Sequence, residues 1–568
     1  MKSKRWQIAP LRTSRADESL AAFPPIIRQL LYNRGYATEA AAASFLKAEV
    51  GFDVDPFQMT GMRAAVQRIR EAIERKEKIT IYGDYDVDGV TATALLVQAL
   101  RSLGGGVEPY IPNRFDEGYG LNPEALTALK ESGVGLVISV DCGIRSPAEA
   151  EHARAIGLDM IISDHHQPAE GDLPSAVAVI NPKQAGDAYP DKDLAGVGVA
   201  YKIAEALRQE FGDSAGGFRL EDLLDLVALG TVADLAPLVG ENRSLVRRGL
   251  DKIRQARRQG LFSLAAVSDL TLAKTTATSI GFILGPRLNA AGRLESALAA
   301  YELLTTTEVK HAGELAQQLN VQNRQRQELT RKIQQEAEVI ALADDPDPVL
   351  LFAVHPEFNP GVVGLAAARL VETHYRPALV GQVSEETTRC SCRSIPEFHI
   401  TQALDQCKDL LVRHGGHAAA AGFTVRNENL PALKERLRSI AREQFRDLEL
   451  RQTINADVEV SLTELRPELL KALDQFQPTG YGNPEAVFVS RNVRVTSSRT
   501  VGMDGKHLKL VVSDGRFTYD AIGFRLGDLL PRLPPLVDLI YTFEANEYNG
   551  RISMQLNLKD LKPAGEPD

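Results

Sequence analysis

The sequence has few cysteines and no long apolar run, and each shortage excludes a class of protein. Four cysteines in 568 residues do not make a disulfide framework, and Cys390 and Cys392 have no second pair at the spacing of a zinc site. No apolar run approaches the roughly 20 residues that span a bilayer. The basic start of the chain, residues 1–15, lacks the apolar core of a signal peptide. We therefore expect a cytoplasmic protein with no membrane partner.

The chain also lacks the positive net charge that is common among nucleic-acid-binding proteins. Its 65 Lys and Arg against 75 Asp and Glu give a net charge of −10, which argues mildly against nucleic acid as a partner. A multidomain chain can nevertheless combine an acidic metal site with one basic groove. Residues 243–258 contain seven Lys or Arg and one Asp. This stretch is either a solvated helix face or a track for the DNA backbone.

A chain of this length predicts several domains rather than one core. Short β-rich runs alternate with helix-like segments through its first half, which is typical of βαβ units and a parallel sheet buried on both faces. The β-rich runs are residues 78–84, 107–113, 135–141, 159–164 and 176–181, and the helix-like segments are residues 62–76, 89–103, 122–132 and 147–156.

The remaining segments have other sequence patterns. Residues 24–48 predict two short helices with a break at Gly35. Residues 306–343, which contain no Gly or Pro after Gly313, predict a rigid helical connector. A second α/β segment follows, and short strands with turns after about residue 454 predict a small β-barrel. The expected parts are residues 1–45 (N-terminal helical segment), 46–304 (first α/β domain), 305–345 (connector helix), 346–450 (second α/β domain), 451–563 (barrel) and 564–568 (tail).

Acidic and imidazole side chains follow three of the predicted strands, at the point where each strand ends. They are Asp84, Asp86 and Asp88 after the first strand, Asp141 after the third, and Asp164, His165 and His166 after the fourth. In an open α/β sheet the carboxyl ends of the strands meet at one crevice. Asp234, at the end of an apolar helix-like run, is a further candidate. Any one aspartate alone could be a helix cap or a turn residue, but all of them together predict a shared site.

Clustered aspartates favour hard divalent cations. They repel one another unless a positive ion lies between them. Oxygen ligands with an imidazole suit Mn²⁺ or Mg²⁺ better than structural zinc, which favours thiolates. Two ions about 3.5–4 Å apart could share one carboxylate and hold a phosphate for in-line displacement. Gly89 allows a tight turn into a helix whose N-terminal amides could face an anion. These features predict a two-metal phosphoesterase.

The order of the motifs resembles a known superfamily. DYDVDG (84–89), VDCG (140–143), SDHH (163–166) and GTVADLAPL (230–238) look like the four motifs of the DHH phosphoesterases. GPRLNAAGRL (285–294) resembles a segment specific to RecJ-type single-stranded-DNA exonucleases, and NPGVVGLAAARL (359–370) and GGHAAAAGF (415–423) resemble the associated DHHA1 domain. The resemblance covers residues 40–560. It implies an α/β fold, with a DHH parallel-sheet domain and a DHHA1 α/β domain joined by a long helix, plus a C-terminal OB-type β-barrel.

The resemblance also implies a role for each motif residue. One Mn²⁺ or Mg²⁺ ion would be held by Asp86, Asp141, His165 and Asp234, and the second by Asp84, Asp88 and the bridging Asp141. His166 would lie against the scissile phosphate, with Arg287 stabilising its charge, and Asp164 would orient a histidine. DNA contacts are implied for Arg114, Arg287, Asn289, Arg293, Ser391, Arg393, Ser394 and His417.

Tyr82 departs from the family pattern. Many members carry a histidine two residues before the first motif aspartate, and tyrosine is a poor ligand for these ions. Asp84 or water is expected to fill that position.

In the barrel, basic residues are interleaved with aromatic residues, which suits base stacking, although aromatic residues of a small barrel are more often core. The residues concerned are Arg491, Arg494, Arg499, Lys506 and Lys509, with Tyr481, Phe488 and Phe517.

The resemblance implies a monomeric 5′→3′ exonuclease that hydrolyses single-stranded DNA to mononucleotides, in DNA repair and recombination, with a helicase and a single-strand-binding protein as partners. The polarity follows from the resemblance alone. Two alternatives remain. A small-substrate DHH phosphodiesterase, acting on cyclic dinucleotides or short oligonucleotides, would lack the barrel and the segment 285–294. A non-catalytic DNA-binding scaffold would have lost the metal ligands.

Overall fold

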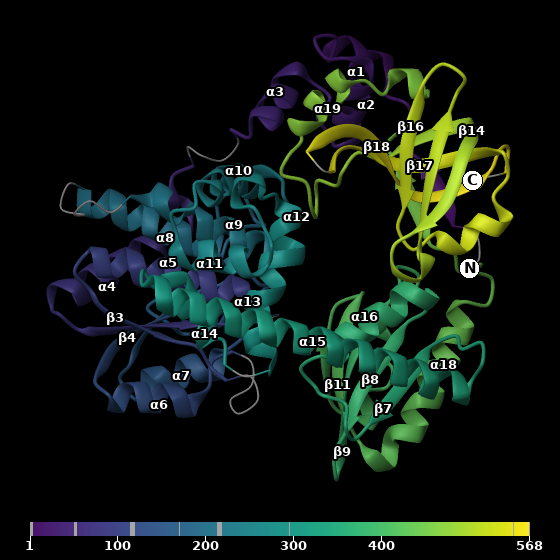
Figure 1. The fold of residues 1–568 in the computed structure, drawn as a ribbon. Helices are drawn as coiled ribbons and strands as arrows, with labels where there is room; N and C mark the ends of the chain where they lie inside the picture. The colour runs from purple at the N-terminus through teal and green to yellow at the C-terminus, as the bar shows by residue number, and fades with distance from the viewer. Residues whose placement is uncertain are drawn as a thin grey trace. The chain divides into compact units, whose positions relative to one another are not determined.

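The computed structural model describes residues 4–49, 54–113, 120–169, 171–212, 219–294, 296–548 and 550–566. The chain divides into two compact units (Figure 1). The larger unit contains Arg5–Asn320 and Thr453–Asp568, and the smaller contains Met1–Lys4 and Val321–Gln452. Helix α15 (Val309–Asp344) occupies the predicted connector, so the chain passes between the units within a helix.

A five-stranded parallel sheet is the centre of the larger unit, as predicted. Its strands are β2 (Lys78–Gly83), β3 (Gly106–Tyr110), β4 (Val134–Val140), β5 (Asp159–Ser163) and β6 (Ala178–Ile180), in the order β3-β2-β4-β5-β6. The helices around it are α4 (Met62–Glu74), α5 (Val87–Ser102), α6 (Pro123–Glu131), α7 (Pro147–Ala155) and α8 (Gly196–Phe211).

Alternate residues of these strands face two different cores, because successive side chains of a strand point to opposite faces. Ile81 and Ile138 pack with α4, α5 and α8, whereas Val137 and Ile162 pack with α6 and α7. Figure 1 shows the two helical layers on opposite faces of the sheet. The strands are therefore covered on both sides, and only their ends are open to carry polar groups.

A group of helices extends this core. They are α9 (Leu224–Ala233), α10 (Gly240–Arg254), α11 (Gln259–Val267), α12 (Ala277–Ser279), α13 (Gly285–Leu294) and α14 (Leu298–Thr305). Helix α9 is buried from Leu224 to Val232, as expected for a helix that is apolar on all sides, and Asp234 is its C-cap. A π-helical turn, Ile280–Leu284, leads directly into α13.

The C-terminal strands form the predicted barrel. They are β13 (Val458–Glu459), β14 (Phe488–Val501), β15 (His507–Ser513), β16 (Thr518–Gly523), β17 (Leu536–Tyr548) and β18 (Arg551–Pro563), and pairing of β14 with β17 closes the ring. Phe488 is core, whereas Tyr481 and Phe517 are exposed. Arg491 pairs with Asp538 at 3.2 Å.

The start of the chain packs against this barrel. It contains β1 (Arg5–Ile8), α1 (Ser14–Ser19), α2 (Pro25–Asn33) and α3 (Glu39–Lys47). The two helices expected around Gly35 are confirmed as α2 and α3. Strand β1 was not predicted, and it pairs in parallel with β12 (Thr453–Ala456). Helices α2 and α3 share the barrel's hydrophobic core with α19 (Pro467–Asp474).

Arg243, at the start of α10, joins three segments of the larger unit. It is 2% exposed, and it lies 4.1 Å from the ring of Phe45. Its guanidinium donates hydrogen bonds of 2.7–3.1 Å to the backbone carbonyls of Phe45, Gln475, Phe476 and Pro478. Burial lowers its pKa to about 10, so it remains charged at neutral pH. The first arginine of the basic stretch 243–258 is thus a buried anchor, neither on a solvated face nor on a DNA track.

The smaller unit is a mixed α/β fold, as predicted. Its strands are β7 (Leu351–His355), β8 (Ala378–Val383), β9 (Thr387–Arg393), β10 (Leu411–Gly416) and β11 (Ala420–Arg426), in the order β10-β11-β9-β8-β7, and its helices are α16 (Val363–His374), α17 (Ile400–Asp405) and α18 (Leu430–Gln444). Only the β7–β8 pair is parallel within this described sheet. Helix α16 packs on one face with the C-terminal half of α15.

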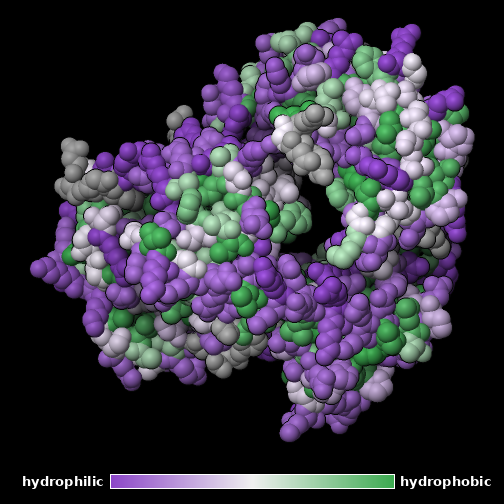
Figure 2. Space-filling model, in the orientation of Figure 1, coloured by the Kyte–Doolittle hydropathy of each residue, from purple (hydrophilic) through white to green (hydrophobic). Residues whose placement is uncertain are grey.

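Hydrophilic residues cover most of the face drawn in Figure 2. On the face drawn in Figure 2, hydrophobic residues lie in small scattered groups. Across the described ranges, no helix is long and apolar enough to cross a membrane. All four cysteines are buried free thiols.

Replacement of Arg243 by alanine should lower the free energy of unfolding of the larger unit by more than about 3 kcal/mol, because four backbone carbonyls lose their donor and three of these hydrogen bonds are buried. Urea unfolding followed by fluorescence of Trp6, the only tryptophan in the sequence, measures the effect. Arg248→Ala, at an exposed position of the same helix, is the matched control and should change stability by less than about 0.5 kcal/mol. Equal urea midpoints for the two variants would contradict the anchoring role.

Candidate metal centre

The acidic cluster lies where three neighbouring strands end. Asp84 and Asp86 follow β2, Asp141 follows β4, and Asp164 follows β5. Strands β2, β4 and β5 are adjacent and parallel, so their carboxyl ends lie at one edge of the sheet. Asp234 reaches the same place from the end of α9.

Asp141 has the most unusual backbone of the cluster. Its φ of 61° places a non-glycine residue in the left-handed region, which is uncommon and concentrated at functional sites. The N-terminus of α8 packs directly against it, since a β-carbon on Gly196 would stand 2.8 Å from the Asp141 β-carbon. The buried Oδ1 of Asp141 has no hydrogen-bond partner. A buried oxygen left in this state is a ready metal ligand.

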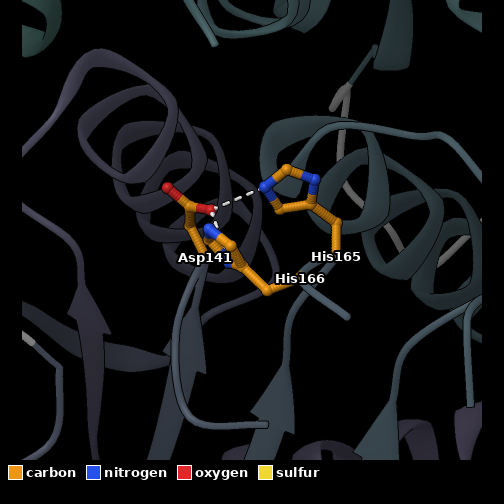
Figure 3. A group of neighbouring side chains, drawn as sticks. All are labelled: Asp141, His165 and His166. Atoms are coloured by element: carbon orange, nitrogen blue, oxygen red, sulfur yellow. Dashed lines mark ion pairs between the residues drawn. The ribbon is translucent and has the colours of Figure 1, made fainter. Parts of the chain in front are cut away.

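Two imidazoles point at the Asp141 carboxylate (Figure 3). His165 Nε2 lies 3.1 Å from Asp141 Oδ1, and His166 Nδ1 lies 3.8 Å from the same oxygen. Burial and the neighbouring charge of His166 lower the pKa of His165 to about 3, so its imidazole is neutral at pH 7. Its buried Nε2 makes no hydrogen bond. A neutral imidazole with an unpartnered nitrogen is the form that binds metal ions.

Asp164 orients His166. Its Oδ1 accepts from the backbone amides of His165 and His166 and lies 2.8 Å from His166 Nδ1, while its Oδ2 accepts from the amide of Ile144. Burial opposes the charge of Asp164, but these hydrogen bonds keep its pKa below the ordinary value. Burial also opposes the charge of His166, yet the bond to Asp164 raises the pKa of His166 to about 9. The pair is therefore an imidazolium held by a carboxylate.

Among the residues that the structure describes, the potential ligand atoms form three groups, and the atoms of each group lie within 4.8 Å of one another. The groups are Asp84, Asp86 and Asp141; Asp88, His165 and Asp234; and Asp141, His165 and His166. The resemblance implies the same residues but places Asp86 with His165 and Asp234, and Asp88 with Asp84. In the structure Asp86 is grouped with Asp84 and Asp141, and Asp88 with His165 and Asp234.

The hydrogen bonds of Asp86 and Asp88 determine how these two carboxylates are held. Asp88 lies in the first turn of α5, and both its oxygens accept from backbone amides of α8, those of Gly196 at 2.7 Å and Val197 at 2.8 Å. Asp86 is the N-cap of α5 and uses only Oδ1 for the capping bonds to Asp88 and Gly89. Asp86 thus retains a free oxygen for a metal, whereas each oxygen of Asp88 already accepts a hydrogen bond from the protein backbone.

Electrostatics favour a cation in this cluster. Burial and the charges of neighbouring aspartates raise the pKa values of Asp88 and Asp141 well above the ordinary range. Burial and the charge of Asp86 raise the pKa of Asp234 to about 7. Without a positive ion, the protein must hold protons on these groups or accept their repulsion. Hard oxygen ligands with one imidazole fit Mn²⁺ or Mg²⁺.

Tyr82 lies outside the ligand groups. Its ring is fully buried in the hydrophobic core that the sheet forms with α6 and α7. Its hydroxyl donates to the carbonyl of Gly120 at 3.0 Å and accepts from Asn122 at 3.2 Å. The tyrosine therefore contributes to packing at this position, and Asp84 is grouped instead with Asp86 and Asp141.

Helix α13 carries three of the predicted DNA-contacting residues. Arg287 donates through Nε to Asn320 Oδ1 at 3.1 Å and through a terminal nitrogen to the carbonyl of Ile283 at 2.8 Å. Asn289 accepts a hydrogen bond from the backbone amide of Val87. Arg293 lies in the last turn of α13 and is half-buried. Another predicted DNA contact, Arg114, lies outside the described residues.

The other predicted contacts lie together in the smaller unit. Ser391 and Arg393 are on β9, and β11 pairs with this strand so that Ala420 lies opposite Arg393. The turn before β11 carries the exposed His417. A β-carbon on Gly364 would stand 3.1 Å from a terminal nitrogen of Arg393, so the guanidinium lies beside the first turn of α16. Ser394 follows directly and donates from its hydroxyl to the carbonyl of Phe398. An arginine, hydroxyls and a helix N-terminus together favour an anion.

Sequence reasoning missed Asn181. It directly follows β6, and its side chain is fully buried. Its amide donates to the carbonyl of His166 at 2.9 Å and its oxygen accepts from the amide of Lys183 at 2.8 Å. The strand-end rule that identified Asp141 applies equally to Asn181, and it would have found this support for the histidine pair.

Comparisons with known proteins identify the family. Family models match for the DHH family N-terminal domain at residues 78–231, the DHHA1 domain at residues 347–443 and the RecJ OB domain at residues 456–560. The chain is 38% identical to the single-stranded-DNA-specific exonuclease RecJ of Bacillus subtilis (strain 168), over 94% of this chain and 68% of that protein. It is 35% identical to the protein of the same name from Escherichia coli (strain K12), over 97% of this chain and 99% of that protein. The chain belongs to the RecJ family.

Solved structures of a RecJ family member share this fold. RecJ of Thermus thermophilus in complex with Mn²⁺ has a TM-score of 0.85 and 29% identity, over all of this chain and 81% of that chain. The complex of the same protein with Mg²⁺ has a TM-score of 0.79 and 28% identity, over 99% of this chain and 79% of that chain. The two ions in these complexes are those that the carboxylate and imidazole groups of the present chain fit.

In the absence of metal, the free energy of unfolding of the wild type should fall relative to that of Asp234→Asn as the pH rises from 5 to 7. The pKa of Asp234 is about 7 in the folded protein, against an ordinary value of 3.8, so this carboxyl holds a proton in the folded state that it lacks in the unfolded state, and its contribution to stability is lost as the proton is released. Asp234 alone accounts for about 2 kcal/mol of this decrease.

Urea unfolding in EDTA at pH 5, 6 and 7 checks this dependence. Asp234→Asn should flatten the slope, and saturating Mn²⁺ should reverse it, because the ion binds the deprotonated carboxylates. An equal slope in the wild type and D234N would show that the carboxylate is not responsible.

Proposed function

We propose that this protein is a metal-dependent 5′→3′ exonuclease that hydrolyses single-stranded DNA to mononucleotides. The observation that carries the proposal is the convergence of aspartates and His165 at the strand ends, where Asp141 Oδ1 and His165 Nε2 are buried 3.1 Å apart and neither makes a hydrogen bond. The named activity of the Bacillus subtilis and Escherichia coli relatives supports the substrate class. The 5′→3′ polarity rests on the family resemblance.

The cluster residues would hold the ions and leave room for the phosphate. Asp84, Asp86 and Asp141 would hold one ion, and His165, Asp234 and the shared Asp141 would hold the second, with Asp88 at its edge. Bound cations would supply a lowered pKa for the attacking water and would neutralise charge on the phosphate. His166, kept protonated by Asp164, would donate a charge-assisted hydrogen bond to a phosphate oxygen.

Arg287 would need a change of partner to contact the phosphate. In the structure its guanidinium is held by Asn320 and Ile283. A phosphate offers a charged acceptor in place of these neutral ones, and charge-assisted hydrogen bonds are roughly twice as strong. We infer that Arg287 turns to the substrate only when DNA is bound.

The smaller unit would bind the 5′-phosphate through Arg393 with Ser391 and Ser394. Burial lowers the pKa of Arg393, and among the described residues no carboxylate forms an ion pair with it. An uncompensated, largely buried guanidinium beside a helix N-terminus favours a phosphate. His417, on the adjoining turn, would contact the terminal nucleotide.

We further propose that the protein acts as a cytoplasmic monomer in DNA repair and recombination, with a helicase and a single-strand-binding protein as partners.

The two alternatives have less support. Hydrolysis of cyclic dinucleotides or short oligonucleotides does not require the closed barrel, which matches the RecJ OB domain. A non-catalytic scaffold has no use for the metal-ligand groups, whose carboxylates carry an electrostatic penalty.

Degradation of 5′-phosphorylated single strands labelled at either end tests the proposal. With Mn²⁺, the 5′-labelled mononucleotide should appear first, EDTA should abolish the activity, and a blunt duplex should resist. His166→Ala should lower kcat by about 100-fold or more, because a charged donor to the phosphate is lost, whereas His311→Ala, on an exposed face of α15, should not change it. Release from the 3′ end first would refute the polarity, and full activity in EDTA would refute the metal centre.

Arg393→Ala should remove the preference for a 5′-phosphate. The KM for a 5′-phosphorylated strand should rise about 10–100-fold, since a charged hydrogen bond contributes about 1.5–3 kcal/mol, while the KM for a 5′-hydroxyl strand should barely change. Arg442→Ala, on the exposed face of α18, is the control. Equal increases for both substrates would place Arg393 elsewhere along the DNA.

A further inference from the structure

Helix α13 contacts the loop that carries the first aspartates of the metal centre. Asn289 Oδ1 accepts a hydrogen bond from the backbone amide of Val87 at 3.1 Å. Further along the helix, a β-carbon on Gly292 would stand only 2.6 Å from the carbonyl oxygen of Tyr85. Residues three apart lie on one face of a helix. This face of α13 is therefore seated on residues 85–87.

The Asn289 bond completes the N-terminus of α5. The Asp86 side chain caps the amides of Asp88 and Gly89 at 2.9 and 3.2 Å. An N-cap side chain reaches the second and third amides of its helix and leaves the first without a partner. That first amide belongs to Val87, and Asn289 supplies its acceptor. The conformation of Asp86 thus depends on two caps, one from its own side chain and one from a helix that lies far along the chain.

The N-terminal part of α13 is also held, through a different side of the helix. Arg287 donates to Asn320 of α15 and to the carbonyl that closes the preceding turn at Ile283. Helix α13 is therefore fixed independently of the metal loop, and Asn289 presents its amide oxygen from a rigid support.

We propose that Asn289 is a positioning residue of the metal centre, whose amide oxygen holds Val87 and thereby aims the free carboxylate oxygen of Asp86 at the metal. This role differs from the DNA contact that the family resemblance implies for Asn289. It rests on the metal centre of the proposed function, but it concerns metal affinity and not the reaction. Loss of such an outer partner typically weakens metal binding by about 10–100-fold.

Two substitutions separate the acceptor role from a DNA contact. Asn289→Ala removes the acceptor, and Asn289→Asp keeps an acceptor oxygen but removes the amide donor and adds a negative charge. Mn²⁺ binding is measured by calorimetric titration of the full-length protein without DNA, and single-stranded DNA binding by fluorescence anisotropy in EDTA. We expect N289A to weaken Mn²⁺ binding by about 10-fold or more and N289D to bind Mn²⁺ at least as tightly as the wild type. N289A should bind DNA in EDTA as the wild type does.

A helix cap far from the cluster provides the matched control. Thr38 caps α3 through its hydroxyl, and Thr38→Ala should leave Mn²⁺ affinity unchanged. Amide hydrogen exchange at residues 87–90 should increase in N289A and not in N289D. If N289A does not fold, Asn289→Leu tests the same loss with a side chain of similar size.

Wild-type Mn²⁺ affinity in N289A, or equal weakening in N289A and N289D, would overturn the proposal. Loss of DNA binding in both variants with unchanged Mn²⁺ affinity would identify a DNA contact instead. Since the titration contains no DNA, its result stands whether or not the protein is an exonuclease.

Discussion

Repulsion among carboxylates is the constraint to which the larger unit is adapted. Asp88 and Asp141 are almost fully buried beside other acidic groups, a combination that raises the pKa of each. Nothing in the hydrophobic effect brings such groups together. They meet because β2, β4 and β5 are neighbours in a sheet covered on both faces, and the apolar packing of that sheet offsets the electrostatic penalty.

The surrounding backbone limits the freedom of each carboxylate to turn away. Amides of α8 hold Asp88, and the amides of Ile144, His165 and His166 hold Asp164. At Asp141 the constraint is instead a left-handed backbone and the close approach of Gly196. Groups fixed in this way cannot relieve their repulsion by moving, so the repulsion must be relieved by bound protons or by a cation. The rigidity of the shell and the need for metal are two aspects of one arrangement.

The sequence predicts the strands and the composition of this site, because both depend on local signals. A strand that is buried on both faces leads to Asp141, and the polar residue that follows such a strand must lie at the sheet edge. The grouping of Asp86 and Asp88 was not predictable in this way. It depends on how the first turn of α5 is rotated and on which amides of α8 lie beside it, and both are set by tertiary packing.

Long-range contacts account for the other differences between prediction and structure. Strand β1 has only four residues and forms by pairing with β12, which lies far along the chain. Arg243 has the sequence context of a solvated basic helix, yet its carbonyl partners come from two distant segments. Tyr82 occupies the place of a metal-binding histidine in the motif pattern, but its contacts with Gly120 and Asn122 make it part of the core. In each case the deciding partner is absent from the local sequence.

The negative net charge argues against nucleic acid as a substrate only while the metal ions are left out of account. The net charge of the chain is −10, and the acidic cluster of the metal centre is the place where DNA is expected to bind. Divalent cations would reverse the local sign of that cluster, so the electrostatic partner of DNA is the protein with its ions rather than the chain alone. Thermodynamic reciprocity then requires that DNA tighten metal binding by the same factor by which metal tightens DNA binding. An acidic protein with a strongly held carboxylate cluster can in this way recognise nucleic acid, provided that the cluster is rigid enough to remain assembled until the ions arrive.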